Sequence, residues 1–166
     1  MGPSASRYVL VFRVGAHHFS VPTPRVREIV HMASLLTSPG QPSVLAGFLN
    51  VRGAAISVVR ISQLFGLDKN VPRLYTPLII LDCAGMPVAI EADSVEEVTE
   101  IHATGMRQLG EGHSLNDCAQ AAFTWNGHEV LMLSCDQLLL AKEKECLREF
   151  QAATQQRLDA LGPVAQ

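Results

Sequence analysis

Aromatic and charged residues are both scarce in this chain of 166 residues, at 5% and 17% of the sequence. Cysteine is scarce as well. A structural zinc site needs Cys or His at short paired spacings, and a disulfide framework is typical of small secreted domains. The four cysteines are scattered and form no C-x-x-C pair, so we expect reduced, buried thiols and no bound metal at Cys83, Cys118, Cys135 and Cys146.

Long apolar runs are also missing. The most apolar stretches, residues 8–12 and 77–81, are far shorter than the roughly 20 residues that a membrane-spanning helix needs. No charged stretch followed by a long apolar region occurs near the start, and we interpret the first six residues as a loose tail. We therefore expect a cytoplasmic protein that does not insert into a membrane.

Motifs of nucleophilic catalysis, phosphate binding, paired-histidine zinc binding and nucleotide binding are absent from the sequence. We therefore predict no catalytic residue and no cofactor, and the chain is not expected to be an enzyme. Nucleic-acid binding needs a concentrated basic stripe, usually with stacking aromatics, whereas the basic residues here are dispersed. No nucleic-acid partner is expected.

Apolar residues make up 48% of the chain, which predicts one globular domain with a sizeable core. The net charge of -3 conceals an asymmetry. Residues 1–75 hold eight Lys and Arg against two Asp and Glu, whereas residues 76–166 hold five against fourteen. Such an asymmetry favours either attraction between two halves of one fold or head-to-tail association of separate molecules.

Short apolar stretches separated by turn residues follow one another along the chain, a pattern typical of small barrels and sandwiches. The strongest turn signal is Asn126-Gly127, because this dipeptide suits the two positive-φ positions of a type I′ hairpin. Gly66 is predicted to end one helical turn at residues 61–65. A polar connection at 68–73 is the expected boundary between two halves, and residues 105–116 are predicted to form a loop or a helical turn. The predicted strands cover residues 8–14, 18–21, 26–32 (extended or briefly helical), 45–51, 54–59, 78–82, 86–90, 95–101, 121–125 and 128–133.

The last part of the chain changes period. Its apolar residues recur at helical spacing from Asp136, a suitable N-cap, to Gly162-Pro163. This predicts an amphipathic helix over residues 137–161. We expect its first half to pack on the domain, and the sequence leaves open whether its second half docks a partner or pairs with itself. The predicted apolar stripe consists of Leu140, Leu147, Phe150, Thr154, Leu158 and Leu161.

The most informative segment is Gly47-Phe48-Leu49-Asn50-Val51-Arg52-Gly53, which leads directly into an apolar strand. Glycine is placed where backbone turns tightly or passes close to another surface. An arginine beside such a glycine can pack its stem and present five donors at the edge of a rigid support. We interpret Arg52 as a recognition group; stabilisation of the turn is the alternative. Asn50 is interpreted as a turn stabiliser.

This G-x-x-N-x-R-G pattern resembles that of the CheW-like coupling proteins of bacterial chemotaxis. The resemblance extends over almost the whole chain, because three further segments fit the family in the expected order. These are Val26-Arg27-Glu28-Ile29, Ala92-Asp93-Ser94-Val95-Glu96-Glu97-Val98, and Leu131-Met132-Leu133 followed by Asp136-Gln137-Leu138-Leu139.

The resemblance implies a mainly all-β fold of two intertwined five-stranded SH3-like β-barrel subdomains, with short helices and a longer C-terminal α-helix. The CheW-like domain is expected at residues 7–141, with halves at 7–72 and 73–136, and the helical extension at 137–161. By resemblance, the receptor contacts are Gly47, Asn50, Arg52 and Gly53, and the kinase face contains Val26, Glu28, Ile29, Ser57 and Arg60. Val26 and Ile29 are alternatively ordinary core residues.

The function that this resemblance implies is that of a chemosensory adaptor. It would couple the cytoplasmic tip of a methyl-accepting chemoreceptor to the regulatory domain of a CheA-like histidine kinase, within a receptor array. The chain departs from the family where Ser57 replaces a proline and Arg60 replaces an acid, which favours a divergent paralogue with altered or lost kinase binding. The alternative is a small all-β ligand-binding domain or enzyme unrelated to chemotaxis. A deep pocket lined by converging ionisable groups would favour this alternative.

Overall fold

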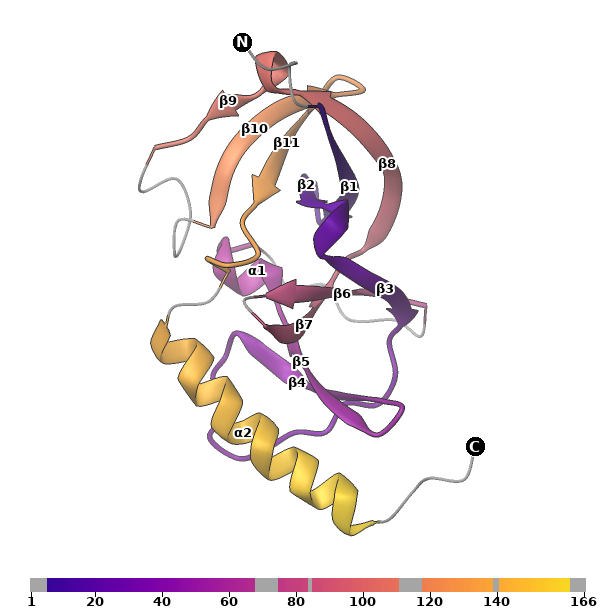
Figure 1. The fold of residues 1–166 in the computed structure, drawn as a ribbon, viewed down its shortest axis with the longest axis vertical. Helices are drawn as coiled ribbons and strands as arrows, with labels where there is room; N and C mark the ends of the chain where they lie inside the picture. The colour runs from indigo at the N-terminus through magenta and orange to yellow at the C-terminus, as the bar shows by residue number, and fades with distance from the viewer. Residues whose placement is uncertain (1–5, 68–74, 84, 111–117, 139–140, 162–166) are drawn as a thin grey trace.

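The computed structural model of the protein describes residues 6–67, 75–83, 85–110, 118–138 and 141–161 (Figure 1). The predicted connection at 68–73 lies outside the described residues, as do residues 1–5 of the predicted tail and residues 111–116 of the predicted loop. The strands are β1 (Ser6–Val14), β2 (His17–Pro22), β3 (Val26–His31), β4 (Leu45–Val51), β5 (Ala54–Val59), β6 (Pro77–Cys83), β7 (Met86–Glu91), β8 (Ser94–His102), β9 (Arg107–Gln108), β10 (Ala119–Trp125) and β11 (His128–Leu133). The helices are the 3-10 turns η1 (Thr23–Arg25) and η2 (Ala103–Gly105), the single turn α1 (Ile61–Leu64) and the long α2 (Ala141–Ala160).

The strands form two curved sheets, one above the other in Figure 1. The first, called sheet A here, has the order β8-β1-β2-β11-β10-β9, and the second, sheet B, has the order β3-β6-β7-β5-β4. The indigo strands β1 and β2 therefore lie among the salmon and orange strands from the end of the chain (Figure 1). In return, β6 and β7 lie in the sheet of β3, β4 and β5.

The two sheets repeat the same pairing pattern. The β1–β2 and β6–β7 hairpins have identical registers when 69 is added to the residue number, since Val9↔Pro22 becomes Leu78↔Glu91. The β4–β5 and β10–β11 hairpins match after adding 74, down to a register shift at the start of each. The chain thus contains two equivalent five-strand units, each of which gives its first hairpin to the other's sheet.

Alternation along the strands distributes the apolar side chains over three clusters. The side chains on one face of β1 and β6, such as Val9 and Leu78, fill a small core inside each sheet. The side chains on the other face, such as Phe12 and Ile79, point into a larger core that both sheets and α2 share. Because both faces of these central strands are buried, the strands are apolar throughout and not alternating.

Most of the predicted elements are confirmed. The mainly β fold class is correct, and the strands at 45–51 and 54–59 have the predicted bounds. Sheet A contains one more strand than expected, because the two-residue β9 forms within the segment that was predicted to be a loop or helical turn. The C-terminal helix exists but begins at Ala141, since residues 136–138 form turns.

Candidate functional site

The β4–β5 turn is built from Arg52 and Gly53, whose φ angles of 49° and 86° are both in the left-handed region. Two positive φ values between paired residues Val51 and Ala54 are the requirement of a two-residue type I′ hairpin. Glycine adopts this region freely, but for a residue with a side chain it is uncommon and costs roughly 1 kcal/mol. Arg52 is therefore held in a backbone conformation that it does not favour.

Neighbouring side chains support this strained turn. The amide of Gly53 donates a hydrogen bond to Asn50 Oδ1 at 2.9 Å, so Asn50 stabilises the turn as predicted. Arg52 Nη2 lies 2.9 Å from Glu28 Oε1 and 3.1 Å from Oε2. The arginine side chain nevertheless remains 72% exposed, so its guanidinium stands at the surface with donors to spare.

The Arg52–Glu28 pair joins opposite edges of sheet B. Glu28 lies on β3 and Arg52 between β4 and β5, and β3 and β4 are the two edge strands of that sheet. The pair brings together a predicted receptor contact and a predicted kinase contact, which the sequence could not place side by side. We use the term Arg52 surface for Glu28, Asn50, Arg52 and Gly53; the next residue of β3, Ile29, is 44% exposed.

Close packing of the backbone requires a glycine at position 47. A Cβ at this position would lie 2.8 Å from the Leu36 carbonyl oxygen and 2.9 Å from the Leu35 Cβ. These contacts arise because Leu36 and Phe48 exchange backbone hydrogen bonds of 2.8 and 2.7 Å. The predicted close approach of backbone is thus present, and Gly47 is buried, so it is not a direct surface contact.

The remaining residues of the predicted kinase face divide into exposed and internal positions. Val26 is half-buried and packs against the shared core. Ser57 is only 1% exposed, which corrects the expectation that its side chain faces a partner; it can act on a partner only through the position of β5. Its hydroxyl has no hydrogen-bond partner among the described residues.

Arg60 is half-buried and has an acidic neighbour within the chain. Burial raises the pKa of Glu91, and the positive charge of Arg60 opposes this by lowering that pKa. The two residues follow Val59 and Ile90, which are paired between β5 and β7. The positive charge of Arg60 therefore acts on an acid of the same chain.

Sheet A contains an equivalent of the Arg52 surface. Glu97 and Val98 correspond to Glu28 and Ile29, and Val98 is 57% exposed. The Glu97 carboxylate accepts a hydrogen bond of 2.5 Å from Trp125 Nε1, where Glu28 binds Arg52. Sequence reasoning missed this correspondence, although Val-x-Glu at residues 26–28 and 95–97 is a visible signal of it.

A second residue that sequence reasoning missed is Gln155 on α2, whose side chain contacts the backbone beside Arg52. Its Nε2 donates to the Gly53 carbonyl at 2.7 Å and its Oε1 accepts from the Ala55 amide at 2.9 Å. One glutamine in a polar helix carries no signal that could reveal such a contact.

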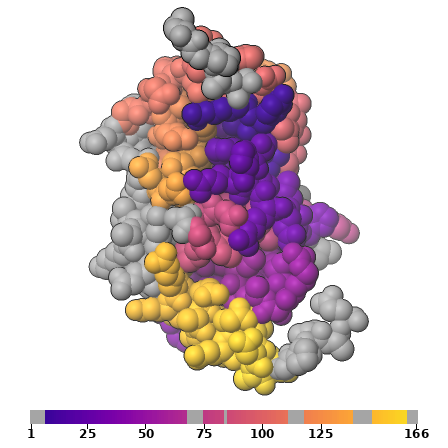
Figure 2. All heavy atoms as spheres, viewed as in Figure 1, coloured from indigo at the N-terminus to yellow at the C-terminus, as the bar shows by residue number. Residues whose placement is uncertain are grey.

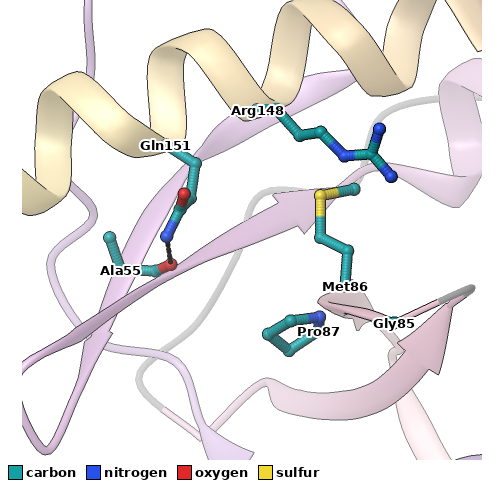
Figure 3. Close-up of a pocket in the computed structure, with 6 residues that line it drawn as sticks. All are labelled: Ala55, Gly85, Met86, Pro87, Arg148 and Gln151. Carbon is teal, nitrogen blue, oxygen red and sulfur yellow. Dashed lines mark hydrogen bonds between the residues drawn. The ribbon is translucent and has the colours of Figure 1, made fainter.

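Between α2 and the start of β7 lies a cleft of about 230 Å³, in which Arg148 is the one ionisable side chain among the described lining residues (Figure 3). Within the described ranges, no three His, Cys, Asp or Glu side chains are grouped closely enough to hold a metal ion. No helix in that part of the chain has the length and apolar character needed to cross a membrane.

Comparison with known proteins adds the family context. A sequence model described as CheW-like domain matches residues 8–143. The chain is 22% identical over 144 residues to the chemotaxis protein CheW of Rhizobium meliloti (strain 1021), covering 86% of this chain and 93% of that protein. It is 24% identical over 95 residues to the probable chemotaxis protein CheW of Rhizobium etli, covering 57% of this chain and 61% of that protein.

Among solved structures, the crystal structure of the scaffolding protein TtCheW from Thermoanaerobacter tengcongensis is similar, with a TM-score of 0.72 at 19% identity. The likeness covers 78% of this chain and 90% of that chain. At this identity it shows the fold, which is the SH3-like two-sheet architecture described above.

Proposed function

Because this chain belongs to the CheW-like family across residues 8–143, we propose that it is a non-enzymatic chemosensory adaptor. It couples the cytoplasmic tip of a methyl-accepting chemoreceptor to a CheA-type histidine kinase in the cytoplasm. Its mechanism is surface complementarity, so it needs no cofactor. A change in the contacts at one surface is passed to the other partner through the rigid two-sheet body.

The observation that carries this proposal is the exposed guanidinium of Arg52 on a strained and supported turn. An arginine is a poor choice for a left-handed position, whereas Asn or Gly satisfies it at no cost. Keeping an arginine there is reasonable if its five donors recognise a carboxylate or a row of carbonyls on a partner. In the proposed complex these donors bind the helical hairpin of the receptor.

The test is co-purification of the adaptor with the cognate receptor fragment, comparing the wild type with Arg52→Glu. We expect the charge reversal to abolish receptor capture, because it replaces donors by a repelling carboxylate beside Glu28. The matched control is Arg107→Glu. Arg107 is also an exposed arginine, paired with Glu129 at 3.0 Å, but it lies on sheet A, away from the Arg52 surface.

Receptor capture by Arg52→Glu at the wild-type level would leave Arg52 a purely structural residue and remove the basis of the proposal. A thermal melt of each variant accompanies the assay. An unchanged melting temperature shows that lost capture is a surface effect and not unfolding.

Within the adaptor role we propose that kinase contact is altered. The support is Arg60, which stands where the family carries an acid and whose charge acts on the internal Glu91. We expect the kinase regulatory domain to bind the wild type weakly and Arg60→Asp more tightly. Strong binding of both the receptor fragment and the kinase domain by the wild type would eliminate this divergent form.

A further inference from the structure

The first part of β5 has an open edge. This strand pairs with β7 only from Ser57 onward, where Ser57 is opposite Val88. The preceding residue of β7 is Pro87, which has no backbone N–H and cannot continue the ladder. The backbone groups of Gly53 and Ala55 along this edge therefore need partners from elsewhere.

Helix α2 supplies those partners with side chains. Gln155 donates to the Gly53 carbonyl at 2.7 Å and accepts from the Ala55 amide at 2.9 Å. Gln151 Nε2 lies 3.4 Å from the Ala55 carbonyl, as the dashed line in Figure 3 marks. Two glutamines one helical turn apart thus replace three hydrogen bonds that a neighbouring strand would have made.

The amide of Gln155 is fully used. Its second N–H donates to Asp159 Oδ1 at 3.2 Å, one turn further along α2. All its donors and its acceptor are engaged, which fixes the orientation of the side chain. A fixed amide that bonds both ends of a three-residue segment restrains the backbone between Gly53 and Ala55.

Apolar contacts hold α2 against the protein along most of its length. Leu147 is fully buried and Thr154 is 2% exposed, while Phe150 and Leu158 pack against the shared core. Packing therefore extends beyond the first half of the helix. Leu140 lies outside the described residues, and among the other members of the predicted stripe only Leu161, which is 79% exposed, does not pack on the protein. Figure 2 shows α2 in yellow lying directly along the lower part of the molecule.

Almost all of α2 lies past residue 143, where the match to the family ends. The helix nevertheless bonds to the turn that carries Arg52. It does so without covering the arginine, whose side chain points to Glu28 on β3 and is 72% exposed. The contact is therefore suited to fixing the turn and not to blocking it.

We propose that α2 is a clamp that holds the β4–β5 turn in its binding conformation, with Gln155 as the positioning residue for Arg52. The clamp rests on the proposed function, because the binding that it serves is capture of the receptor at the Arg52 surface. When Gln155 is removed, the turn loses a restraint on its left-handed backbone, and the arginine samples orientations that do not bind. Preorganisation of this kind changes affinity without adding a contact to the partner.

The first test measures the clamp in the isolated protein. Amide hydrogen exchange at Ala55 is compared in the wild type, Gln155→Ala and Gln156→Ala. Gln156 is the matched control, being the same residue type on the exposed side of the helix. We expect faster exchange at Ala55 in Gln155→Ala only, since its acceptor is lost. Unchanged exchange in that variant overturns the clamp.

The second test measures its effect on the partner site. Binding of a soluble chemoreceptor cytoplasmic fragment is expected to weaken about fivefold in Gln155→Ala, the effect of one hydrogen bond. The same substitution in an Arg52→Ala background should change binding little, because Gln155 acts through Arg52. A purely structural role for Gln155 would give the same loss in both backgrounds.

The outcomes separate the clamp from the proposed function. If the wild-type protein does not bind the fragment, the receptor role is refuted, and so is the positioning role of Gln155. The hydrogen-exchange data still decide whether the clamp exists. Wild-type binding that is unaffected by Gln155→Ala overturns the positioning role and leaves the proposed function in place. Equal losses of fragment binding in Gln155→Ala and Gln156→Ala would also overturn the positioning role of Gln155.

Discussion

The β4–β5 and β10–β11 hairpins have the same lengths, the same register and the same turn geometry. They form this turn with different residues. Each joins a strand of seven residues to one of six through two residues with positive φ. The second turn uses Asn126-Gly127, a dipeptide that adopts this geometry without help. The first turn uses Arg52-Gly53 and depends on side chains around it.

The difference shows which of the two turns departs from the local preference of its residues. Asn50, Glu28 and Gln155 all contact the first turn or its arginine. At the second turn, the residue equivalent to Glu28 binds Trp125 and not the turn itself. A turn that needs three supports is a costly place for an arginine, which supports our proposal that the exposed end of Arg52 binds a partner.

The largest change in the free energy of unfolding is expected when the start of the first hairpin is given the residue found at the start of the second. Gly47 corresponds to Ala121, which is 2% exposed and tolerated in sheet A. Gly47→Ala should lower the free energy of unfolding by about 3 kcal/mol, because its Cβ would meet the Leu36 backbone. Ala121→Gly should cost about 0.5–1 kcal/mol. Urea denaturation measures both, and equal costs would contradict the difference in packing described here.

An exchange of the two turn residues tests the comparison directly. Asn126→Arg should lower the free energy of unfolding by about 1 kcal/mol, since that turn lacks the supports of the first. Arg52→Asn should change stability by less than about 0.5 kcal/mol but abolish receptor capture. Chemical denaturation and the capture assay are run on both variants. A destabilised Arg52→Asn protein would mean that the arginine serves the fold.

A smaller effect is expected from the support provided by Asn50. Asn50→Ala removes the acceptor for the Gly53 amide and should cost about 0.5–1 kcal/mol. The control is Thr124→Ala at the equivalent exposed position of β10, which should stay within about 0.5 kcal/mol of the wild type. If both changes cost the same in a thermal melt, the first turn needs no side-chain support.

The smallest effect is a pH dependence at the contact between the second hairpin and β2. Its end carries His128, which stacks on His18 with ring centroids 4.5 Å apart. Burial and then the charge of His128 lower the pKa of His18. Because the unfolded chain takes up the proton first, stability is full above pH 6.5 and falls as the pH drops through that value. Denaturation at pH 7.5 and 5.5 should show a smaller fall in His18→Asn than in the wild type.

Local patterns were enough to predict much of the fold. Apolar runs bounded by turn residues placed the β4 and β5 strands at their observed ends, and Asn126-Gly127 predicted its own hairpin. The sequence also indicated Arg52 as exposed and Asn50 as a turn stabiliser, because both properties depend on residues within the same short segment.

What the sequence did not reveal depends on contacts between distant residues. The exchange of first hairpins between the sheets arises from pairing of strands that are far apart in the sequence, such as β2 with β11, and β9 forms because an existing strand accepts it. Ser57 is buried because it shares a face of β5 with Ala55 and Val59, which lie in the shared core. Gln155 is a surface residue by every local criterion, and its role appears only when α2 is seen beside the open edge of β5.

The crossing of β1–β2 and β6–β7 between sheets has a consequence for assembly of the molecule. Neither half of the chain contains all the strands of either sheet, so each half alone would leave a gap in the middle of a sheet with both neighbours unpaired. Folding must then be a single cooperative event with long loop closures. A chain cleaved between the halves would behave as two complementary fragments, each unfolded until it meets the other.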